Sequence, residues 1–291
     1  MAEWVRVESP AKVNLHLGVR RALRADGYHE IATVFQAIEL CDVVELSRQG
    51  DTVTVECGIP GVPLDGSNLA VRAVEALRAD AGSQVGVHVR LRKQIPPMGG
   101  LGGGSSNAAA ALVGAAYLLD VWAEPGRLER IASRLGADVA FFIRGGMQVG
   151  RERGEALMAV SSPHRPWVVV VKGPGCASTA RVYAEFDREG EESPMSVAEA
   201  VGRFTSRDFS GLFNSLAAPA IRLVPEIGDG VAALRAAGAA GATVAGSGAC
   251  AFGVFTERGA ADAAARSLSG RFEFVRACAL REDGVRVVGA E

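Results

Sequence analysis

The chain contains 291 residues, of which 48% are hydrophobic and 22% are charged, and its formal net charge at pH 7 is −2. This composition is typical of a globular protein with one large domain or two ordinary ones, and the lack of a basic stripe argues against nucleic-acid binding. Five scattered cysteines without a CxxC pair, and no run of about 18 apolar residues, argue against a disulfide framework, a zinc site and a membrane span, so we expect a cytoplasmic protein.

The N-terminal part of the chain predicts four strands and one helix. Alternating apolar residues predict strands at 4–8 and 13–19, separated by a turn at Ser9-Pro10-Ala11-Lys12. A further pair of strands, at 43–46 and 52–56, is expected to join across the turn-like Gln49-Gly50-Asp51. Asn68 is a suitable N-cap for an amphipathic helix over residues 69–78.

A glycine-rich segment follows, PPMGGLGGGSSNAAAAL from Pro96 to Leu112. It lies between a strand with one polar face, residues 85–91, and an alanine-rich helix over 108–119 that Ser105, Ser106 and Asn107 are predicted to cap. Because glycine lets the backbone approach a ligand and a helix start offers unpaired N–H groups, the segment is suited to a phosphate. It lacks the Lys-Ser or Lys-Thr pair of a Walker A motif, and Ser105 replaces the third glycine of a dinucleotide fingerprint.

The remaining chain alternates helices and strands. Helices are predicted at 128–135, 197–204, 227–237 and 260–268, and strands at 167–171, 251–255, 272–279 and 285–288. Residues 139–143 form a short apolar run, residues 188–194 are expected to be exposed, and residues 161–166 mark the best domain boundary. Mixed helices and amphipathic strands indicate two-layer α+β domains.

Three side chains are candidates for chemistry. Lys12 and Asn14 project onto the same face of an extended chain, although a solvated lysine at a strand edge is the simpler explanation for Lys12. Asp138 directly precedes the apolar run 139–143, so it is either a helix cap or a partly buried functional acid.

Two turns carry weaker signals. Asp26-Gly27-Tyr28-His29 is either a hairpin tip or a place where an aromatic ring and an imidazole bind a planar ligand. Ala245-Gly246-Ser247-Gly248-Ala249 joins two apolar strands, and its glycines allow close approach of another backbone.

Five segments occur in one order along the chain: PAKVNLHL, DGYHEIATVF, the glycine-rich segment, LGADVAFFIRGG and AGSGACAFGVF. Together they resemble the GHMP kinase superfamily, and DGYH with GADV resembles its branch that acts on a cytidine diphosphate conjugate of methylerythritol. The resemblance implies an N-terminal domain similar to the second domain of ribosomal protein S5 over residues 1–162, and a ferredoxin-like C-terminal domain over 163–291. It also implies transfer of the γ-phosphoryl group of ATP to the 2-hydroxyl of that conjugate, in the non-mevalonate route to isoprenoids.

The resemblance further implies roles for individual residues. Lys12 and Asp138 match the catalytic pair. The ATP-binding residues would be Pro96, Pro97, Met98, Gly99, Gly100, Leu101, Gly102, Gly103, Gly104, Ser105 and Ser106. The second substrate would contact Asn14, Tyr28, His29, Tyr183, Gly246 and Ser247. Mg²⁺ would arrive with the nucleotide, held by phosphates and water, so no protein metal site is expected.

Two other functions fit parts of the pattern. Another kinase of the superfamily, such as homoserine or mevalonate kinase, would share the glycine-rich segment, but its substrate has no base for DGYH to contact. A nucleotide-binding regulator without catalysis predicts loss of Lys12 or Asp138, and both are present. The sequence leaves a homodimer open and does not fix the oligomeric state.

Overall fold

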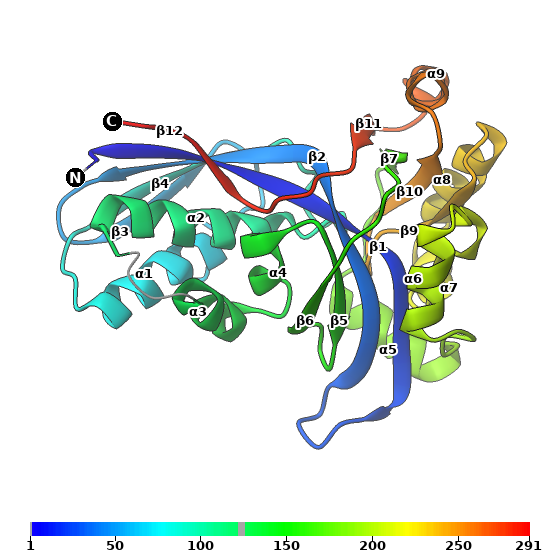
Figure 1. Ribbon diagram of the computed structural model, residues 1–291, viewed down its shortest axis with the longest axis horizontal. Helices are drawn as coiled ribbons and strands as arrows, with labels where there is room; N and C mark the ends of the chain where they lie inside the picture. Colours follow the sequence, from blue (N-terminus) through cyan, green and yellow to red (C-terminus); the bar gives the residue numbers. More distant parts are fainter. Residues whose placement is uncertain (1, 122–125) are drawn as a thin grey trace.

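The computed structural model describes residues 2–121 and 126–291. In that part, two sheets and the helices packed on them confirm the predicted α+β class (Figure 1). The first sheet contains β1 (Trp4–Leu23), β2 (His29–Arg48), β3 (Val53–Cys57), β4 (Val87–Arg92), β5 (Met147–Arg151), β6 (Ala156–Val160), β8 (Phe213–Asn214) and β12 (Arg286–Ala290). The second contains β7 (Trp167–Lys172), β9 (Gly241–Val244), β10 (Cys250–Phe255) and β11 (Phe274–Ala279).

The helices follow the same division. Those of the N-terminal half are α1 (Leu69–Ala81), α2 (Gly103–Leu119), α3 (Arg127–Leu135) and α4 (Val139–Arg144). Those of the C-terminal half are α5 (Thr179–Glu189), α6 (Val197–Thr205), the short 3-10 turn η1 (Phe209–Gly211), α7 (Ala217–Leu223), α8 (Pro225–Ala236) and α9 (Arg258–Leu268). Within the described residues, none of these helices combines the length and the apolar character needed to span a bilayer.

The strands β1 and β2 form one long hairpin, and the turn predicted at residues 9–12 is wrong. Pro10 lies opposite Cys41, and the register shifts between Pro10 and Ala11. A bulge therefore accommodates the proline, which has no N–H to give to a ladder, and the strand continues through Lys12. Figure 1 shows the resulting curved hairpin, which begins beside α2, bends down between β5 and the C-terminal helices, and ends in a tip at the bottom of the view.

The predicted pairing of strands 43–46 and 52–56 is also wrong, because β4 lies between β2 and β3. β4 is antiparallel to β2 and parallel to β3. Gly86 leads into β4, and a Cβ atom there would lie 2.3 Å from the Gln49 carbonyl oxygen and 2.5 Å from that of Thr52. Glycine thus lets β4 enter the sheet where a direct hairpin was expected.

Two helices cover the first sheet. Asn68 caps α1 as predicted, its side chain accepting from the N–H of Ala70 at 2.9 Å, and Gly82 in the left-handed region ends the helix. α2 begins at Gly103 instead of at the predicted 108, and its alanines are almost all buried against β1, β2 and α1. Small side chains let this helix lie close to the sheet, and they place its N-terminus beside the middle of the hairpin.

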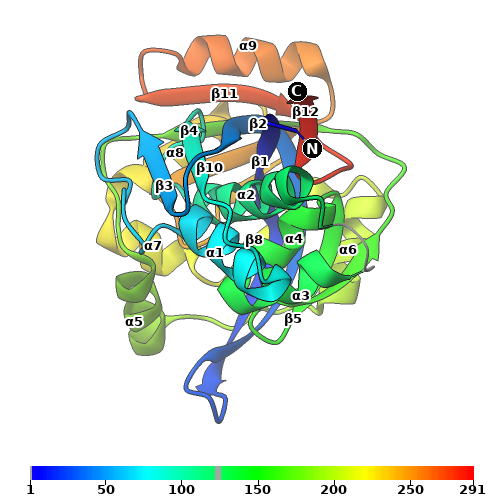
Figure 2. The same ribbon diagram turned by 90° about the vertical axis from the view of Figure 1, so that its left-hand side faces the viewer.

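The second sheet has the order β11-β7-β10-β9; its strands β7, β10 and β9 are buried on both faces, whereas the edge strand β11 is half-buried. Val169 and Val171 of β7 face α8 and α9, whereas Val168 and Val170 face the core shared with β1 and β2. This double burial explains why β7 is apolar from Trp167 to Val171. Figure 2 shows α9 lying along β11 on the outside of this sheet. The helices α5 and α7 were not predicted, and the apolar run at 139–143 is the helix α4.

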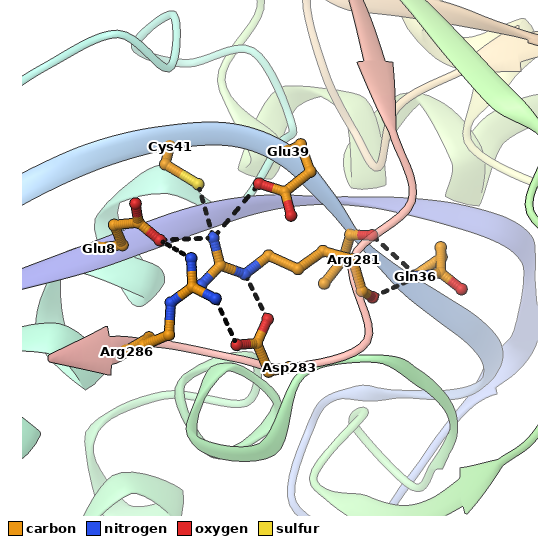
Figure 3. Close-up of polar contacts among 8 residues, drawn as sticks. Glu8, Gln36, Glu39, Cys41, Arg281, Asp283 and Arg286 are labelled. Carbon is orange, nitrogen blue, oxygen red and sulfur yellow. Dashed lines mark hydrogen bonds and ion pairs between the residues drawn. The ribbon is translucent and has the colours of Figure 1, made fainter. Parts of the chain in front are cut away.

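The C-terminal segment, residues 280–290, returns to the first sheet, where β12 pairs with β1. Arg281 anchors it with a side chain that is 1% exposed. Its guanidinium donates to Glu8 at 2.9 Å and to Asp283 at 2.6 Å, and lies 3.4 Å from Glu39 (Figure 3). Arg286 completes the group by donating to Glu8 at 2.8 Å. These ion pairs join β1, β2 and the C-terminal segment through the buried Arg281, whose partners are partly exposed.

Candidate active site

Two adjoining cavities lie where the glycine-rich segment meets the hairpin. The loop cavity, of about 420 Å³, is lined by Gly61, Val62, Pro63, Ser67, Asn68, Leu69, Leu91, Lys93, Pro96, Pro97, Met98, Gly99, Gly100, Leu101, Gly102, Gly103, Gly104, Ser105 and Asn107. The Lys12 cavity, of about 330 Å³, is lined by Lys12, Asn14, Leu17, Ile31, Phe35, Gly100, Gly102, Ala137, Asp138, Arg153, Thr179, Tyr183, Leu216, Gly246 and Ser247. Gly100 and Gly102 line both, so the two cavities adjoin at the loop.

The glycines of the loop are required by its geometry. Gly100 and Gly102 have φ of 75° and 74°, in the left-handed region that favours glycine. A Cβ atom at Gly100 would lie 1.8 Å from the carbonyl oxygen of Ala245, and one at Gly102 would lie 2.7 Å from the Phe142 ring and 3.1 Å from Lys12 Cγ. The loop therefore interlocks with the turn between β9 and β10 and passes close to Lys12.

The first turn of α2 faces the loop cavity with free backbone donors. Gly102 occupies the N-cap position, and no side chain caps the helix, so the prediction that Ser105, Ser106 and Asn107 cap it is wrong. The first N–H bonded within the helix is that of Ser106, to the carbonyl of Gly102 at 2.9 Å. The N–H groups of Gly103, Gly104 and Ser105 lie before it and therefore have no partner within the helix. A helix start with such N–H groups is suited to an anion.

A buried polar network fixes the position of this helix start. Ser106 accepts from Ser9 at 2.8 Å, and Asn107 donates to Asp42 at 2.9 Å. Asp42 is fully buried and also accepts from the N–H of Ile95 at 2.8 Å. Ser106 lines neither cavity, and its predicted part in ATP binding stays a prediction.

Lys12 is a buried cation with specific partners, so a solvated strand-edge lysine is the wrong explanation for it. It is 5% exposed, its Nζ donates to Asn14 Oδ1 at 2.8 Å, and it lies 3.5 Å from Asp138 Oδ2. Asn14 is held in turn by Thr33, to whose hydroxyl its amide donates at 2.8 Å. Burial of an ammonium group is unfavourable unless it is paired, so these contacts fix the Lys12 side chain over the cavity.

Asp138 stands at the N-cap position of α4, yet its carboxylate makes no capping hydrogen bond. Its side chain is 28% exposed and points to Lys12 across the cavity. Of the two explanations left open by the sequence, the helix cap is wrong. The carboxylate is free to accept a proton from a group that enters the cavity.

The aromatic residues occupy the outer end of the same region. Tyr183 lines the Lys12 cavity, and burial, together with the charge of Asp138, raises the pKa of its phenol to about 12, so it stays neutral at pH 7. His29 stacks on Tyr183 with ring centroids 5.5 Å apart and donates from Nδ1 to the Arg20 carbonyl at 2.7 Å. Tyr28 is 58% exposed at the hairpin tip. Tyr28 and His29 do not line the cavity themselves.

The turn between β9 and β10 closes the cavity on the remaining side. Gly246 has φ of 55°, and its carbonyl accepts from Asn214 at 2.7 Å. Ser247 Oγ lies 2.9 Å from Thr179 Oγ1. Both residues line the Lys12 cavity, together with Lys12, Asn14, Asp138 and Tyr183. Six of the eight residues predicted outside the glycine-rich segment thus meet in one cavity.

Several lining residues were missed from the sequence. The loop cavity includes Gly61, Val62 and Pro63, which precede α1 in an irregular stretch without a motif, and Lys93 at the end of β4. Arg153, in the turn between β5 and β6, lines the Lys12 cavity. The described residues contain no group of three or more His, Cys, Asp or Glu side chains that could hold a metal ion.

Replacement of Gly100 by Ala is expected to lower both thermal stability and ATP affinity. The new Cβ would overlap the Ala245 carbonyl in a left-handed conformation, and such strain costs on the order of 1–3 kcal/mol. At about 2–4 °C for each kcal/mol, the thermal midpoint should fall by several degrees, as measured by circular dichroism. Gly104→Ala is the control, because nothing lies within 4 Å of its Cβ position and alanine favours the helix, so its midpoint should not fall. Equal midpoints for both variants would contradict the interlocked loop.

Comparisons with known proteins show the family to which the chain belongs. The model of the GHMP kinases N terminal domain matches residues 68–146, and that of the GHMP kinases C terminal domain matches residues 191–273. A 4-diphosphocytidyl-2-C-methyl-D-erythritol kinase from Geobacter sulfurreducens is 38% identical over 275 residues, covering 93% of this chain and 97% of that protein. 

Solved structures agree as well. The crystal structure of a 4-(cytidine 5'-diphospho)-2C-methyl-D-erythritol kinase is similar with a TM-score of 0.78 and 33% identity, covering 94% of this chain and 98% of that one. A homoserine kinase from Cytophaga hutchinsonii shares the fold at a TM-score of 0.76 and 20% identity, over 99% of this chain and 98% of that one. The chain therefore has the GHMP kinase fold and belongs, within the GHMP kinases, to the 4-diphosphocytidyl-2-C-methyl-D-erythritol kinase family.

Proposed function

We propose that this protein transfers the γ-phosphoryl group of ATP to the 2-hydroxyl of 4-diphosphocytidyl-2-C-methyl-D-erythritol, giving the 2-phosphate and ADP. The reaction belongs to the non-mevalonate route to isoprenoid precursors. The observation that carries the proposal is the pair Lys12 and Asp138, 3.5 Å apart, in a cavity that shares Gly100 and Gly102 with the loop cavity. A nucleotide along the loop thus directs its terminal phosphate toward the pair.

Asp138 acts as the general base. Its carboxylate is partly accessible and makes no capping bond, so it accepts the proton of the 2-hydroxyl as the oxygen attacks phosphorus. Lys12 holds the carboxylate in place, with Nζ 3.5 Å from Oδ2 of Asp138.

Charge neutralisation supplies most of the remaining catalysis, since phosphoryl transfer depends on positioning and electrostatics more than on covalent steps. Lys12 and the N–H groups at the start of α2 stabilise the charge on the transferred phosphoryl group. Mg²⁺ carried by ATP would neutralise phosphate charge, and it would be held mainly by the phosphates and water rather than by protein side chains.

The second substrate is recognised through its base. Tyr28 and Tyr183 stack on cytosine, and His29 hydrogen-bonds its edge, which distinguishes cytosine from uracil. Asn14, Gly246 and Ser247 contact the methylerythritol end. The enzyme works in the cytoplasm, with a division between its two domains near residue 162, and a homodimer is the assembly we propose to test by light scattering.

A coupled ADP-release assay against a panel of alcohols tests this function. The cytidine diphosphate conjugate should be phosphorylated, whereas free methylerythritol phosphate, homoserine and mevalonate should give at most background rates, because they carry no base for the aromatic residues. Phosphorylation of homoserine or mevalonate without the conjugate would assign the protein to another branch of the superfamily. ATP binding without any phosphorylation would favour a regulator.

A further inference from the structure

The turn between β5 and β6, residues 151–155, projects over the Lys12 cavity and is held rigidly. The N–H of Gly154 donates to the Arg151 carbonyl at 2.9 Å, and the N–H of Ile31 donates to the Glu152 carbonyl at 2.6 Å. Gly154 has φ of 108°, and a Cβ atom there would lie 3.3 Å from Ile31 and 3.5 Å from Phe35. The turn is therefore clamped to the beginning of β2, beside the hairpin tip.

Arg153 is the residue of this turn that lines the cavity. Its Nε donates to Glu155 Oε1 at 3.2 Å, and its guanidinium lies over the Tyr28 ring, 5.0 Å from the centroid. Within the described residues no hydrogen bond to either Nη atom is found, and the side chain is 40% exposed. Glu155 and Tyr28 thus fix the orientation of the guanidinium while one of its edges stays available.

The position of Arg153 matches one particular part of the substrate. In a cytidine diphosphate conjugate, two phosphates separate the base from the alcohol that reacts. Tyr28 lies at the outer end of the site and Asp138 at the inner end, and Arg153 contacts the former and shares a cavity with the latter. Lys12 is the one other cation among the lining residues described, and Asn14 and Asp138 already engage it.

We propose that Arg153 binds the diphosphate of the cytidine conjugate, as a specificity-determining residue that selects a diphosphate-linked substrate over a bare nucleoside. The inference rests on the proposed function. Arginine suits this task, because its planar fork can give two parallel hydrogen bonds to a phosphate and its charge is permanent. Glu155 holds the Nε side of the fork, so the Nη atoms bind the phosphate oxygens.

Binding of cytidine, CMP and CDP, measured by calorimetry without turnover, tests the proposal. Wild-type protein should bind CDP more tightly than cytidine. Arg153→Ala should weaken CDP by about tenfold, as expected for loss of a charge-assisted hydrogen bond, while cytidine affinity stays within about twofold. Arg153→Lys should restore part of the loss, because it keeps the charge without the fork. In kinetics, the KM for the conjugate should rise while the KM for ATP is unchanged.

Arg151→Ala is the matched control, because it removes the same positive charge at a position two residues from Arg153. The Arg151 side chain is exposed and does not line the Lys12 cavity. It should leave the preference for CDP over cytidine intact. An equal loss in both variants, or an intact preference in Arg153→Ala, would overturn the role of Arg153 alone. Failure of the wild-type protein to bind any cytidine compound would overturn the proposed function, and the diphosphate site with it.

Discussion

Asp138→Asn is expected to lower kcat by about 10²–10⁴-fold, the contribution typical of a general base, while ATP and the cytidine conjugate still bind. The amide cannot accept the hydroxyl proton, yet its shape is that of the carboxylate. Lys12→Met should cause a similar loss, because it removes the buried ammonium that faces Asp138 at 3.5 Å while filling most of the same volume. Steady-state kinetics and calorimetric binding of each substrate measure the two effects separately.

The kcat of the double variant should be little lower than that of either single variant. When two groups act as a unit, either substitution already removes their joint contribution to catalysis, so the second adds little. Asp120→Asn is a matched control, since Asp120 is exposed at the end of α2 and lines neither cavity, and kcat should stay near the wild-type value. Full activity of Asp138→Asn would remove Asp138 from the mechanism. Multiplying effects in the double variant would mean that Lys12 and Asp138 act independently.

Arg281→Ala is expected to destabilise the folded protein by about 1.5–3 kcal/mol, the scale of hydrogen bonds to charged groups, because Arg281 is buried whereas its carboxylate partners are 29–49% exposed. Glu8, Glu39 and Asp283 would then lose the cation between them, and Cys41 would lose its donor at 3.3 Å (Figure 3). The free energy of unfolding in urea, from the midpoint and slope of the transition, measures the effect.

Arg286→Ala is the control for this prediction. Its side chain is 55% exposed, although it also pairs with Glu8 and Asp283, and exposed pairs contribute about 0–1 kcal/mol. The prediction would be contradicted if Arg281→Ala also lowered the free energy of unfolding by less than about 1 kcal/mol. Water would then solvate the carboxylates of Glu8, Glu39 and Asp283 adequately in the absence of Arg281.

The elements whose boundaries depend on their own residues could be predicted from the sequence. Asn68 and the apolar face of α1 determined that helix, which continues three residues beyond the prediction to the glycine at 82. β7 and β10 were recognised by their apolar runs and β11 was also predicted, whereas no range was predicted for β9. The turn at Pro10 and the pairing of β2 with β3 failed, because a bulge and an inserted strand depend on partners distant in sequence.

The candidate site was predicted unevenly for the same reason. The place of the glycine-rich segment beside a helix start was predictable from its own residues, although the helix starts earlier than expected. The meeting of Lys12 with Asp138 followed from resemblance to a family and not from spacing. Arg153 and residues 61–63 have no local signature, and only the fold brings them to the cavities.

The pairing of β12 with β1 has a consequence for biosynthesis. Val5 lies opposite Ala290 in this ladder, so the ribosome must reach residue 290 before that edge of β1 finds its partner. At roughly 5–20 residues per second, the delay is on the order of tens of seconds. During that time the backbone N–H and C=O groups on this edge of β1 have not yet paired with β12. They can therefore pair with strands of other nascent chains. Chaperone dependence during synthesis should therefore exceed that during unfolding and refolding of the finished polypeptide, in which both strands are present from the start.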